Sequence, residues 1–251
     1  MTNSFPVRLN TVFYVGSSLI EYMKVGYKDL GTMPYKECWE LQQTLFDSRL
    51  EQRRDGSQTE DCGTILTVEH PPVYTLGKSG KQSNMLIPES YLKSLGAEFF
   101  HIDRGGDITF HGPGQIVCYP ILDIGKLGIG LRRYIEILEQ AVIDTIANYG
   151  ICGERLAGAT GVWLCNRAAD GTATAWRKIC AIGVRASHFI TMHGLALNVT
   201  TDLKWFTMIN PCGFTDKGVT SISKEVGVAV DINEVKALLV ANLTKALLDE
   251  K

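Results

Sequence analysis

Two residues of this chain combine a reactive side chain with a position that could expose it to a substrate. Cys212 lies in the loop sequence Asn210-Pro211-Cys212-Gly213, where proline and glycine interrupt regular structure and no apolar periodicity requires a buried sulfur. A thiol with the ordinary pKa of about 8.5 is only a few per cent thiolate at neutral pH, so a nucleophilic cysteine needs a nearby cation or base. The candidates for that partner are His111, His188, His193 and Lys178.

Lys178 differs from the histidines because it precedes an apolar run, Ile179 to Val184, that is typical of a buried strand. An ammonium at the start of such a strand would point toward a region that excludes water, where it could activate a thiol. The alternative is an ordinary strand-end lysine whose stem covers apolar surface while its charge reaches solvent. The spacing of the residues leaves both interpretations open.

A glycine-rich segment, Arg104 to Gln115 (RGGDITFHGPGQ), separates two predicted strands and contains four glycines in twelve residues. Glycines allow a backbone to approach a ligand closely, and Arg104 and His111 would bring polar side chains to a bound carbonyl or carboxylate. The alternative is a surface loop without a ligand. The segment matches neither GxxxxGK[ST] nor a GxGxxG that opens a helix, so it does not indicate nucleotide binding.

The histidines and cysteines argue against a metal centre and a disulfide framework. The five histidines form no HxxxH pair and have no cysteine at ligand spacing, and the seven cysteines form no CxxC pair. Cys38, Cys118, Cys165 and Cys180 lie in apolar patterns and are expected in the core. Scattered free thiols fit a reducing cytoplasm.

Hydrophobic periodicity predicts the elements that would position these residues. Helices are expected at Pro34–Arg53, Leu131–Tyr149 and from Asp231 onward, with Gly150 ending the second. Strands are expected at Thr64–Glu69, Ala97–Ile102, Gln115–Ile124, Gly161–Cys165, Ile179–Val184 and Leu195–Val199, with Asp170-Gly171 as a hairpin turn. Because the elements are interspersed without strict strand–helix alternation, we expect an α+β fold in which helices pack on a mixed sheet.

Composition bounds the class of protein. With 251 residues, 45% of them hydrophobic, the chain can bury the core of one domain, which we expect to span residues 1–251. The 25 Lys and Arg nearly balance the 27 Asp and Glu, so no global positive field favours nucleic acid or an anionic membrane. The amino terminus lacks a signal-peptide pattern and no apolar run reaches 18 residues, from which we expect a cytoplasmic protein.

Five motifs, in this order along the chain, resemble those of the lipoyl(octanoyl) transferases, a family similar in fold to the catalytic domain of biotin and lipoate protein ligases. The motifs are HPPVYTLG (His70 to Gly77), RGGDITFHGPGQ with the following Ile116 to Tyr119, KICAIGVR (Lys178 to Arg185), HGLALNV (His193 to Val199) and NPCGF (Asn210 to Phe214). The resemblance spans most of the chain. It departs from the family pattern only at Asn166–Thr174 and in the Asp55–Cys62 loop, neither of which carries a motif.

The resemblance implies the roles of individual residues. Cys212 would be the nucleophile that forms an acyl thioester, and Lys178 would lower its pKa and shuttle the proton. The substrate would be bound by Arg104, Gly105, Gly106, Asp107, Ile108, Thr109, Phe110, His111, Ala181, Ile182, Gly183, Gly194, Leu195 and Ala196.

The same resemblance implies the substrates. The donor would be octanoyl-4′-phosphopantetheine on an acyl carrier protein, and the acceptor a lysine of the lipoyl domains of 2-oxoacid dehydrogenase complexes or of the glycine cleavage H protein. No ATP, metal or other cofactor would be needed, and the reaction would be the first step of endogenous protein lipoylation. Because such partners are generally acidic, we expect basic residues beside the motifs to bind them, namely Arg104, Lys78, Lys81, Arg185 and Lys204.

Three rival functions remain at this point. An ATP-dependent lipoate or biotin ligase on the same fold would need a phosphate-handling loop, which the sequence does not show. A carrier-binding scaffold would hold the acyl group without transferring it, and would not need Cys212. A cysteine hydrolase would need Cys, His and Asn or Asp in a recognisable order, and no such signature is present.

Overall fold

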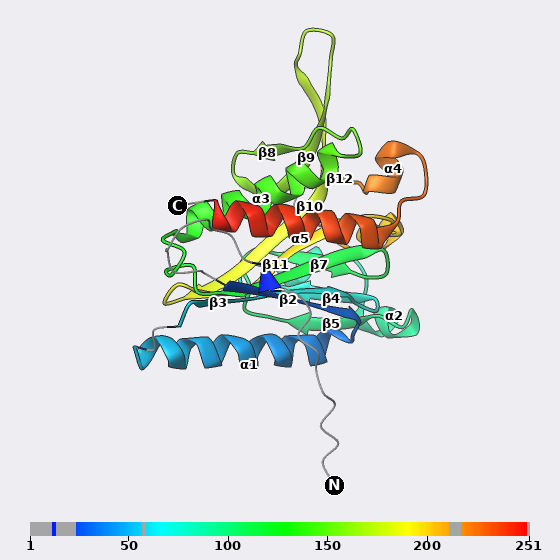
Figure 1. Ribbon diagram of the computed structural model, residues 1–251. Helices are drawn as coiled ribbons and strands as arrows, with labels where there is room; N and C mark the ends of the chain where they lie inside the picture. Colours follow the sequence, from blue (N-terminus) through cyan, green and yellow to red (C-terminus); the bar gives the residue numbers. More distant parts are fainter. Residues whose placement is uncertain (1–11, 14–23, 57–58, 211–216, 250–251) are drawn as a thin grey trace.

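The computed structural model describes residues 12–13, 24–56, 59–210 and 217–249. A nine-stranded mixed sheet runs through the middle of the molecule in the order β1-β2-β3-β7-β11-β10-β9-β8, with β12 pairing alongside β10 (Figure 1). Its strands are β1 (Val12–Phe13), β2 (Lys24–Thr32), β3 (Asp61–Glu69), β7 (Gln115–Leu122), β8 (Glu154–Leu156), β9 (Ala159–Arg167), β10 (Ala173–Ser187), β11 (Ile190–Asn198) and β12 (Gly218–Val219). The pairs β2–β3 and β10–β12 are parallel and the others antiparallel.

A three-stranded sheet carries the glycine-rich segment. Its order is β5-β4-β6, formed by Glu98–His101, Val73–Leu76 and Ile108–His111. The short helix α2 (Glu89–Ser94) and the 3-10 turns η1 (Gln82–Asn84) and η2 (Leu203–Met208) lie in the connections around it. Its core, which includes Tyr74 and Phe110, is separate from the cores on the large sheet.

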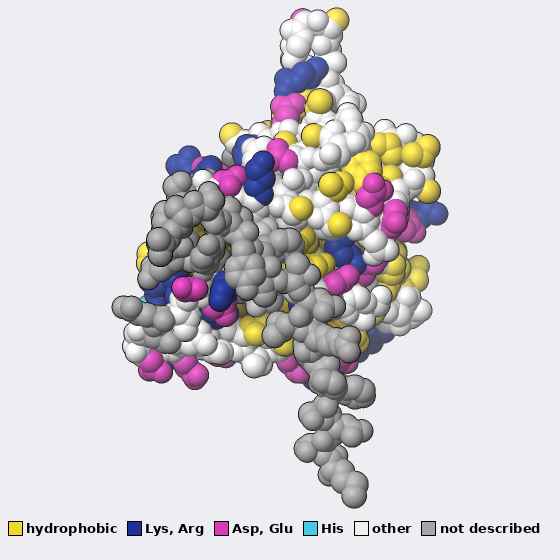
Figure 2. All heavy atoms as spheres, viewed as in Figure 1, with side chains coloured by type: hydrophobic (Ala, Val, Ile, Leu, Met, Phe, Trp, Pro, Cys, Tyr) yellow, Lys and Arg dark blue, Asp and Glu magenta, His cyan; other side chains and the backbone are white. Residues whose placement is uncertain are grey.

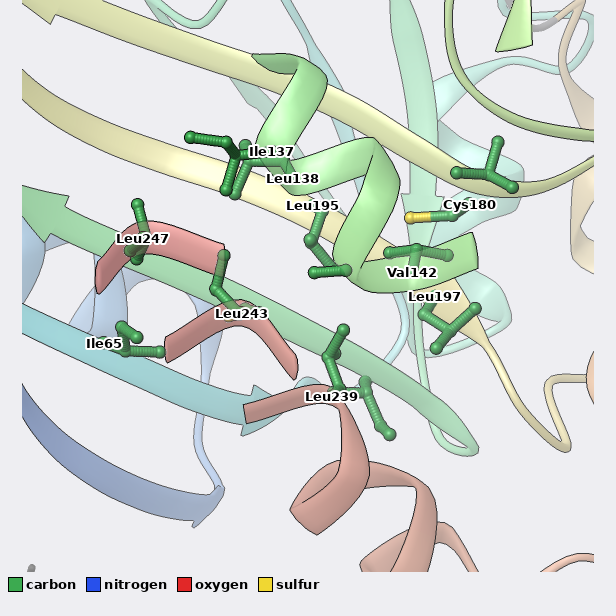
Figure 3. Packing of buried hydrophobic residues seen from close by; sticks show 14 of the residues in the cluster. Ile65, Ile137, Leu138, Val142, Cys180, Leu195, Leu197, Leu239, Leu243 and Leu247 are labelled. Atoms are coloured by element: carbon green, nitrogen blue, oxygen red, sulfur yellow. The ribbon is translucent and has the colours of Figure 1, made fainter. Parts of the chain in front are cut away.

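Long helices cover both faces of the large sheet. Helices α3 (Leu131–Ala147) and α5 (Ile232–Leu248) lie on one face, and α1 (Tyr35–Arg54) lies on the other (Figure 1). Figure 3 shows Leu138 and Val142 of α3 and Leu239 and Leu243 of α5 converging on Leu195 of β11, all of them buried. The short helix α4 (Ile222–Val226) connects β12 to α5.

The predicted fold class is confirmed, because helices pack on a mixed sheet, and the three predicted helices form within one or two residues of their expected bounds. Asp231 caps α5 as its Oδ1 accepts a hydrogen bond from the amide of Asn233 at 2.9 Å. Gly150, with φ at 71°, follows the end of α3 as expected.

Two local predictions were wrong. Cys165 is only half-buried, whereas Cys38, Cys118 and Cys180 are buried as expected. The strand predicted at Ile179–Val184 begins earlier, at Ala173, and includes Lys178, because the hairpin around Gly171 pairs further along β9 than the apolar pattern indicated. None of the helices in the described part of the chain combines the length and the apolar character needed to cross a lipid bilayer.

The hairpin between β9 and β10 projects from the body of the molecule (Figure 1). On the face shown in Figure 2, Lys and Arg side chains are interspersed with Asp and Glu, without a large area of one sign. This distribution agrees with the near balance of charges in the sequence.

Candidate active site

A cavity of about 480 Å³ lies between the glycine-rich segment, the centre of β10 and β11, and the first turns of α3. Lys178 lines it, as do all the predicted binding residues except Phe110. Phe110 points to the opposite side of β6 from its chain neighbours, into the core of the three-stranded sheet. There its ring stacks on the ring of Trp205, with 5.1 Å between the two centroids. Segments far apart in the sequence therefore form one site.

The cavity wall also includes side chains that no motif indicated. Tyr35, Ile135, Thr160 and Trp163 contribute to it from α1, α3 and β9. In the sequence Tyr35, Ile135 and Trp163 occupy ordinary apolar periods, which indicated only burial, and Thr160 lies just outside a predicted strand. Their share in the cavity follows from the order of the strands, which local periodicity does not specify.

Close contact between β10 and the glycine-rich segment depends on Gly183. The amide of Gly105 donates a hydrogen bond to the carbonyl of Val184 at 2.9 Å. A Cβ at Gly183 would lie 2.8 Å from the carbonyl oxygen of Gly105 and 3.1 Å from Cδ of Arg104. Any side chain at Gly183 would therefore push the two segments apart.

Arg104 is buried and holds the glycine-rich segment against β4. Its Nη2 donates to the carbonyl oxygen of Thr75 at 2.7 Å and to the Thr75 hydroxyl at 2.9 Å, and its Nη1 donates to the carbonyl of Gly105 at 2.9 Å. With 8% of its surface exposed, Arg104 is not available to bind the surface of a protein partner. The prediction that Arg104 binds the surface of an acidic partner was therefore wrong.

The side chain of His111 belongs to a buried polar network. Its Nδ1 donates to Oε1 of Gln115 at 2.8 Å, while Nε2 of Gln115 donates to Oδ1 of Asn198 at 2.8 Å. Burial lowers the pKa of His111 to about 3. At neutral pH His111 is therefore uncharged and cannot supply a cation to a thiol.

The other two candidate histidines are also poor sources of positive charge at the cavity. Burial lowers the pKa of His193, whose Nε2 donates to Oδ1 of Asp103 at 3.0 Å. The hydrogen bond from His193 in turn lowers the pKa of Asp103, which also pairs with Arg185. His188 is exposed at the turn between β10 and β11 and does not line the cavity.

His70, in the first motif, positions a tyrosine of the cavity wall. Its Nδ1 donates to the carbonyl of Met33 at 2.8 Å, so in the neutral ring Nε2 accepts a hydrogen bond from the Tyr119 hydroxyl at 3.0 Å. Burial lowers the pKa of His70 to about 4, which keeps this neutral form at neutral pH.

Lys178 has a defined environment inside the cavity. Its Nζ donates to the carbonyl oxygen of Thr160 at 3.2 Å and lies 4.5 Å from the centroid of the Trp163 ring. A β-bulge separates Lys178 from Cys180 in the pairing with β9, and such bulges re-aim the neighbouring side chain. Lys178 is thus a partly buried lysine in the middle of β10 that lines the cavity, rather than a residue at the start of a strand.

Cys212 lies outside the described residues. Before Cys212, the last described residue is Asn210, whose amide donates a hydrogen bond to the carbonyl of Asn84 at 2.8 Å. It resumes at Lys217, which lines the cavity, and continues into β12, where Val219 is the register partner of Lys178. Across residues 24–56, 59–210 and 217–249, no group of three or more His, Cys, Asp or Glu side chains is arranged to hold a metal ion.

The matching family model is described as the lipoyl protein ligase A/B catalytic domain, and it matches residues 34–244. A protein of Bacteroides fragilis named octanoyltransferase is 52% identical over 228 residues, which cover 91% of this chain and 100% of that protein. An octanoyltransferase of Bacteroides thetaiotaomicron is 51% identical and covers 91% of this chain and 98% of its own length.

Solved structures agree on the fold. A bipartite lipoate protein ligase of Thermoplasma acidophilum superposes with a TM-score of 0.60 at 16% identity, covering 87% of this chain and 82% of its own. Lipoate-protein ligase A bound with ATP gives a TM-score of 0.56 at 16% identity, covering 73% and 72%. Fold and cavity therefore define a member of the lipoyl protein ligase A/B catalytic domain family. Within it, the chain belongs to the octanoyltransferases, a family of acyltransferases.

Proposed function

We propose that this protein transfers an octanoyl group from octanoyl-acyl carrier protein to a lysine of a lipoyl domain, through a thioester on Cys212 and without ATP. The observation that carries the proposal is the position of Lys178 in the wall of the cavity, beside β12. Cys212 precedes Lys217 by five residues, which span at most about 18 Å. Because Lys217 lines the cavity, this stretch of chain is short enough for Cys212 to reach the cavity.

In the first step the thiolate of Cys212 attacks the carrier thioester. A new carbon–sulfur bond forms, the bond to pantetheine breaks, and the pantetheine sulfur leaves as a thiol by taking up the proton that Cys212 released when it ionised. Lys178 as an ammonium favours the thiolate of Cys212 by its charge. Because one thioester replaces another, the step is nearly balanced in free energy and needs no ATP.

In the second step the amine of the acceptor lysine attacks the acyl-enzyme. A carbon–nitrogen bond forms, the bond to Cys212 breaks, and the proton of the amine passes to the leaving sulfur by way of Lys178. The amide product is much more stable than the thioester, which drives the reaction forward.

The oxyanion that develops in both steps needs hydrogen-bond donors in the cavity. The amide of Gly105 already donates to Val184, and Gly183 is paired with Gly194 in the β10–β11 ladder, which leaves the amide of Gly106 as our candidate. Such a donor is worth about 3 to 4 kcal/mol in other enzymes.

The donor and acceptor proteins, a cytoplasmic location and a single domain spanning residues 1–251 are part of the same proposal. The donor and acceptor and the single domain are supported by the octanoyltransferase relatives, which match along about nine tenths of the chain, and the location rests on the sequence pattern alone. The lipoate ligases share the fold at 16% identity or less, so they do not favour an ATP-dependent reaction here.

The intact mass of an apo lipoyl domain tests the proposal after incubation with octanoyl-acyl carrier protein and enzyme, without ATP. We expect an octanoyl increment with the wild type and with Cys152→Ala, which removes an exposed cysteine, but none with Cys212→Ala. An increment that requires free octanoate and ATP would replace the transferase with a ligase. Octanoyl-carrier binding without transfer would indicate a scaffold.

A further inference from the structure

The peptide unit between Thr160 and Gly161 contacts Lys178 on one side and a buried carboxylate on the other. Its carbonyl oxygen, on Thr160, accepts the hydrogen bond from Nζ of Lys178 at 3.2 Å. Its N–H, on Gly161, donates to Oε1 of Glu139 at 3.0 Å. Because both groups belong to one rigid plane, the orientation of the N–H fixes that of the carbonyl.

The carboxylate of Glu139 is held in place by contacts of its own. It is 7% exposed and lies on α3, and its second oxygen, Oε2, accepts from Nε of Arg155 at 3.0 Å. Arg155 is also bound to α3 through the carbonyl of Glu136 at 3.0 Å and Oε1 of Gln140 at 2.9 Å. The carboxylate is therefore fixed to a long helix that packs against the sheet.

Gly161 itself has no side chain whose packing could set the orientation of the peptide. Gly161 has φ at 121°, and a Cβ there would lie 2.5 Å from the carbonyl oxygen of Cys180 and 3.6 Å from Cε of Lys178. The peptide thus lies directly against the stem of Lys178. The hydrogen bond to Glu139, which lies on α3 and not on this strand, fixes the orientation of the peptide.

We propose that Glu139 is a positioning residue, which orients the Thr160–Gly161 peptide so that its carbonyl holds the Lys178 ammonium in the cavity wall. A hydrogen bond from the N–H to a carboxylate also polarises the peptide and strengthens its carbonyl as an acceptor. The proposal rests on the role of Lys178 in the proposed function. Glu139 itself contacts neither substrate nor the reacting atoms.

The test compares three substitutions in the full-length enzyme, with octanoyl-acyl carrier protein and an apo lipoyl domain as substrates. Glu139→Leu removes the acceptor, and we expect kcat to fall about tenfold or more while KM for the carrier stays within about twofold. Glu139→Gln keeps an acceptor for Gly161 and should retain kcat within about threefold of wild type. Arg155→Leu removes the ion pair but leaves the bond to Gly161, so it should lower stability without lowering kcat.

Site-resolved alkylation of Cys212 by iodoacetamide gives a readout that loss of stability alone would not change. We expect Glu139→Leu to slow it and Glu136→Leu, one turn earlier on α3, to leave it unchanged. If Glu139→Leu does not fold, Glu139→Asp keeps the charge but is one methylene too short to reach Gly161, and must show the same losses. Wild-type kcat in a folded Leu or Asp variant, or an effect on KM alone, overturns the proposal.

The failure of this proposal is distinguishable from failure of the function. If Cys212→Ala or Lys178→Ala retains full transfer, the proposed reaction is wrong and Glu139 has no lysine to position. If both lose transfer while the Glu139 variants match wild type, the reaction stands and only the role of Glu139 fails.

Discussion

Lys178 and Trp163 are register partners on neighbouring strands, and Nζ of the lysine lies over the indole face, 4.5 Å from its centroid. The indole is itself fixed, because its Nε1 donates to the carbonyl of Ala159 at 2.8 Å. An aromatic face and a carbonyl oxygen both favour the charged form of a lysine. The cavity wall therefore gives the Lys178 ammonium two contacts that stabilise positive charge. In the proposed reaction the first step uses this charge, while the second step requires Lys178 to give up a proton.

Substituting Lys178 by arginine separates those two requirements. Arg keeps the positive charge but cannot be deprotonated in a protein. We expect Lys178→Arg to form octanoyl-Cys212 but to transfer the group to the lipoyl domain at least about a hundredfold more slowly. Intact mass of the enzyme during turnover shows whether the acyl-enzyme accumulates.

The controls for this experiment are Lys178→Met and Lys204→Arg. The first removes the charge and should impair both steps. The second makes the same chemical change at an exposed position, and should behave as wild type. Transfer by Lys178→Arg at the wild-type rate would mean that the lysine acts only through its charge.

Gly183 provides a test of the contact between β10 and the glycine-rich segment. A methyl group there would lie 2.8 Å from the carbonyl of Gly105, so Gly183→Ala should displace the segment that lines the cavity. We expect KM for octanoyl-acyl carrier protein to rise about tenfold or more. Steady-state kinetics measure it.

Gly26→Ala is the matched control, because a Cβ at Gly26 would make only an ordinary contact at 3.4 Å with the Thr64 hydroxyl on the neighbouring strand. Its kinetics should equal those of the wild type. A Gly183→Ala enzyme with unchanged KM would show that the segment tolerates the displacement.

The sequence predicted the elements better than it predicted the site they build. Leu138 and Val142 share one face of α3, so their 3.6-residue spacing was enough to identify a buried helix. The strand order β3-β7-β11-β10 depends on contacts between distant segments, and no local period specifies it. This is why the pattern indicated only a core position for Trp163, although its side chain lines the cavity.

Glu139 and Arg104 illustrate a second limit of the sequence. A glutamate on a predicted helix is usually a solvated residue, whereas Glu139 is buried because the amide of Gly161 and the guanidinium of Arg155 satisfy its two oxygens. Arg104 was predicted at the site and lies there, but its bonds to Thr75 place it beneath the surface. Hydrogen-bond partners of this kind depend on tertiary structure.

Reversing exposed charges tests the binding of an acidic carrier. Lys78, Lys81 and Lys204 are exposed, whereas Arg185 is paired with Asp103 at 2.5 Å and partly buried. We expect Lys81→Glu to raise Kd for the carrier severalfold at low salt, with the difference shrinking as salt rises, because salt screens exposed charges. Titration calorimetry at two salt concentrations measures this, and Lys245→Glu on α5, far along the chain from the motifs, is the control. An equal effect at both concentrations would contradict an electrostatic origin.

His70 should make stability depend on pH in the mildly acidic range. Its pKa is about 4 in the folded protein, against an ordinary value of about 6.5. Between these values the unfolded chain binds a proton that the folded protein does not, so the contribution of His70 is complete above about pH 6.5 and is lost as the pH falls toward 4. From pH 6.5 to pH 5 the loss amounts to about 2 kcal/mol in the free energy of unfolding.

His70→Gln removes this titrating group together with its bonds to Met33 and Tyr119. We expect the variant to be less stable than the wild type at pH 7 by about 1 to 2 kcal/mol, and the gap to narrow by about 2 kcal/mol at pH 5. Urea unfolding at pH 7, 6 and 5 measures the gap, with His101→Gln at an exposed position of β5 as the control. His111 remains in both proteins and acts in the same direction, since burial lowers its pKa to about 3, so both should still lose stability in acid. A gap that stays constant over this range would mean that His70 is not kept neutral by burial.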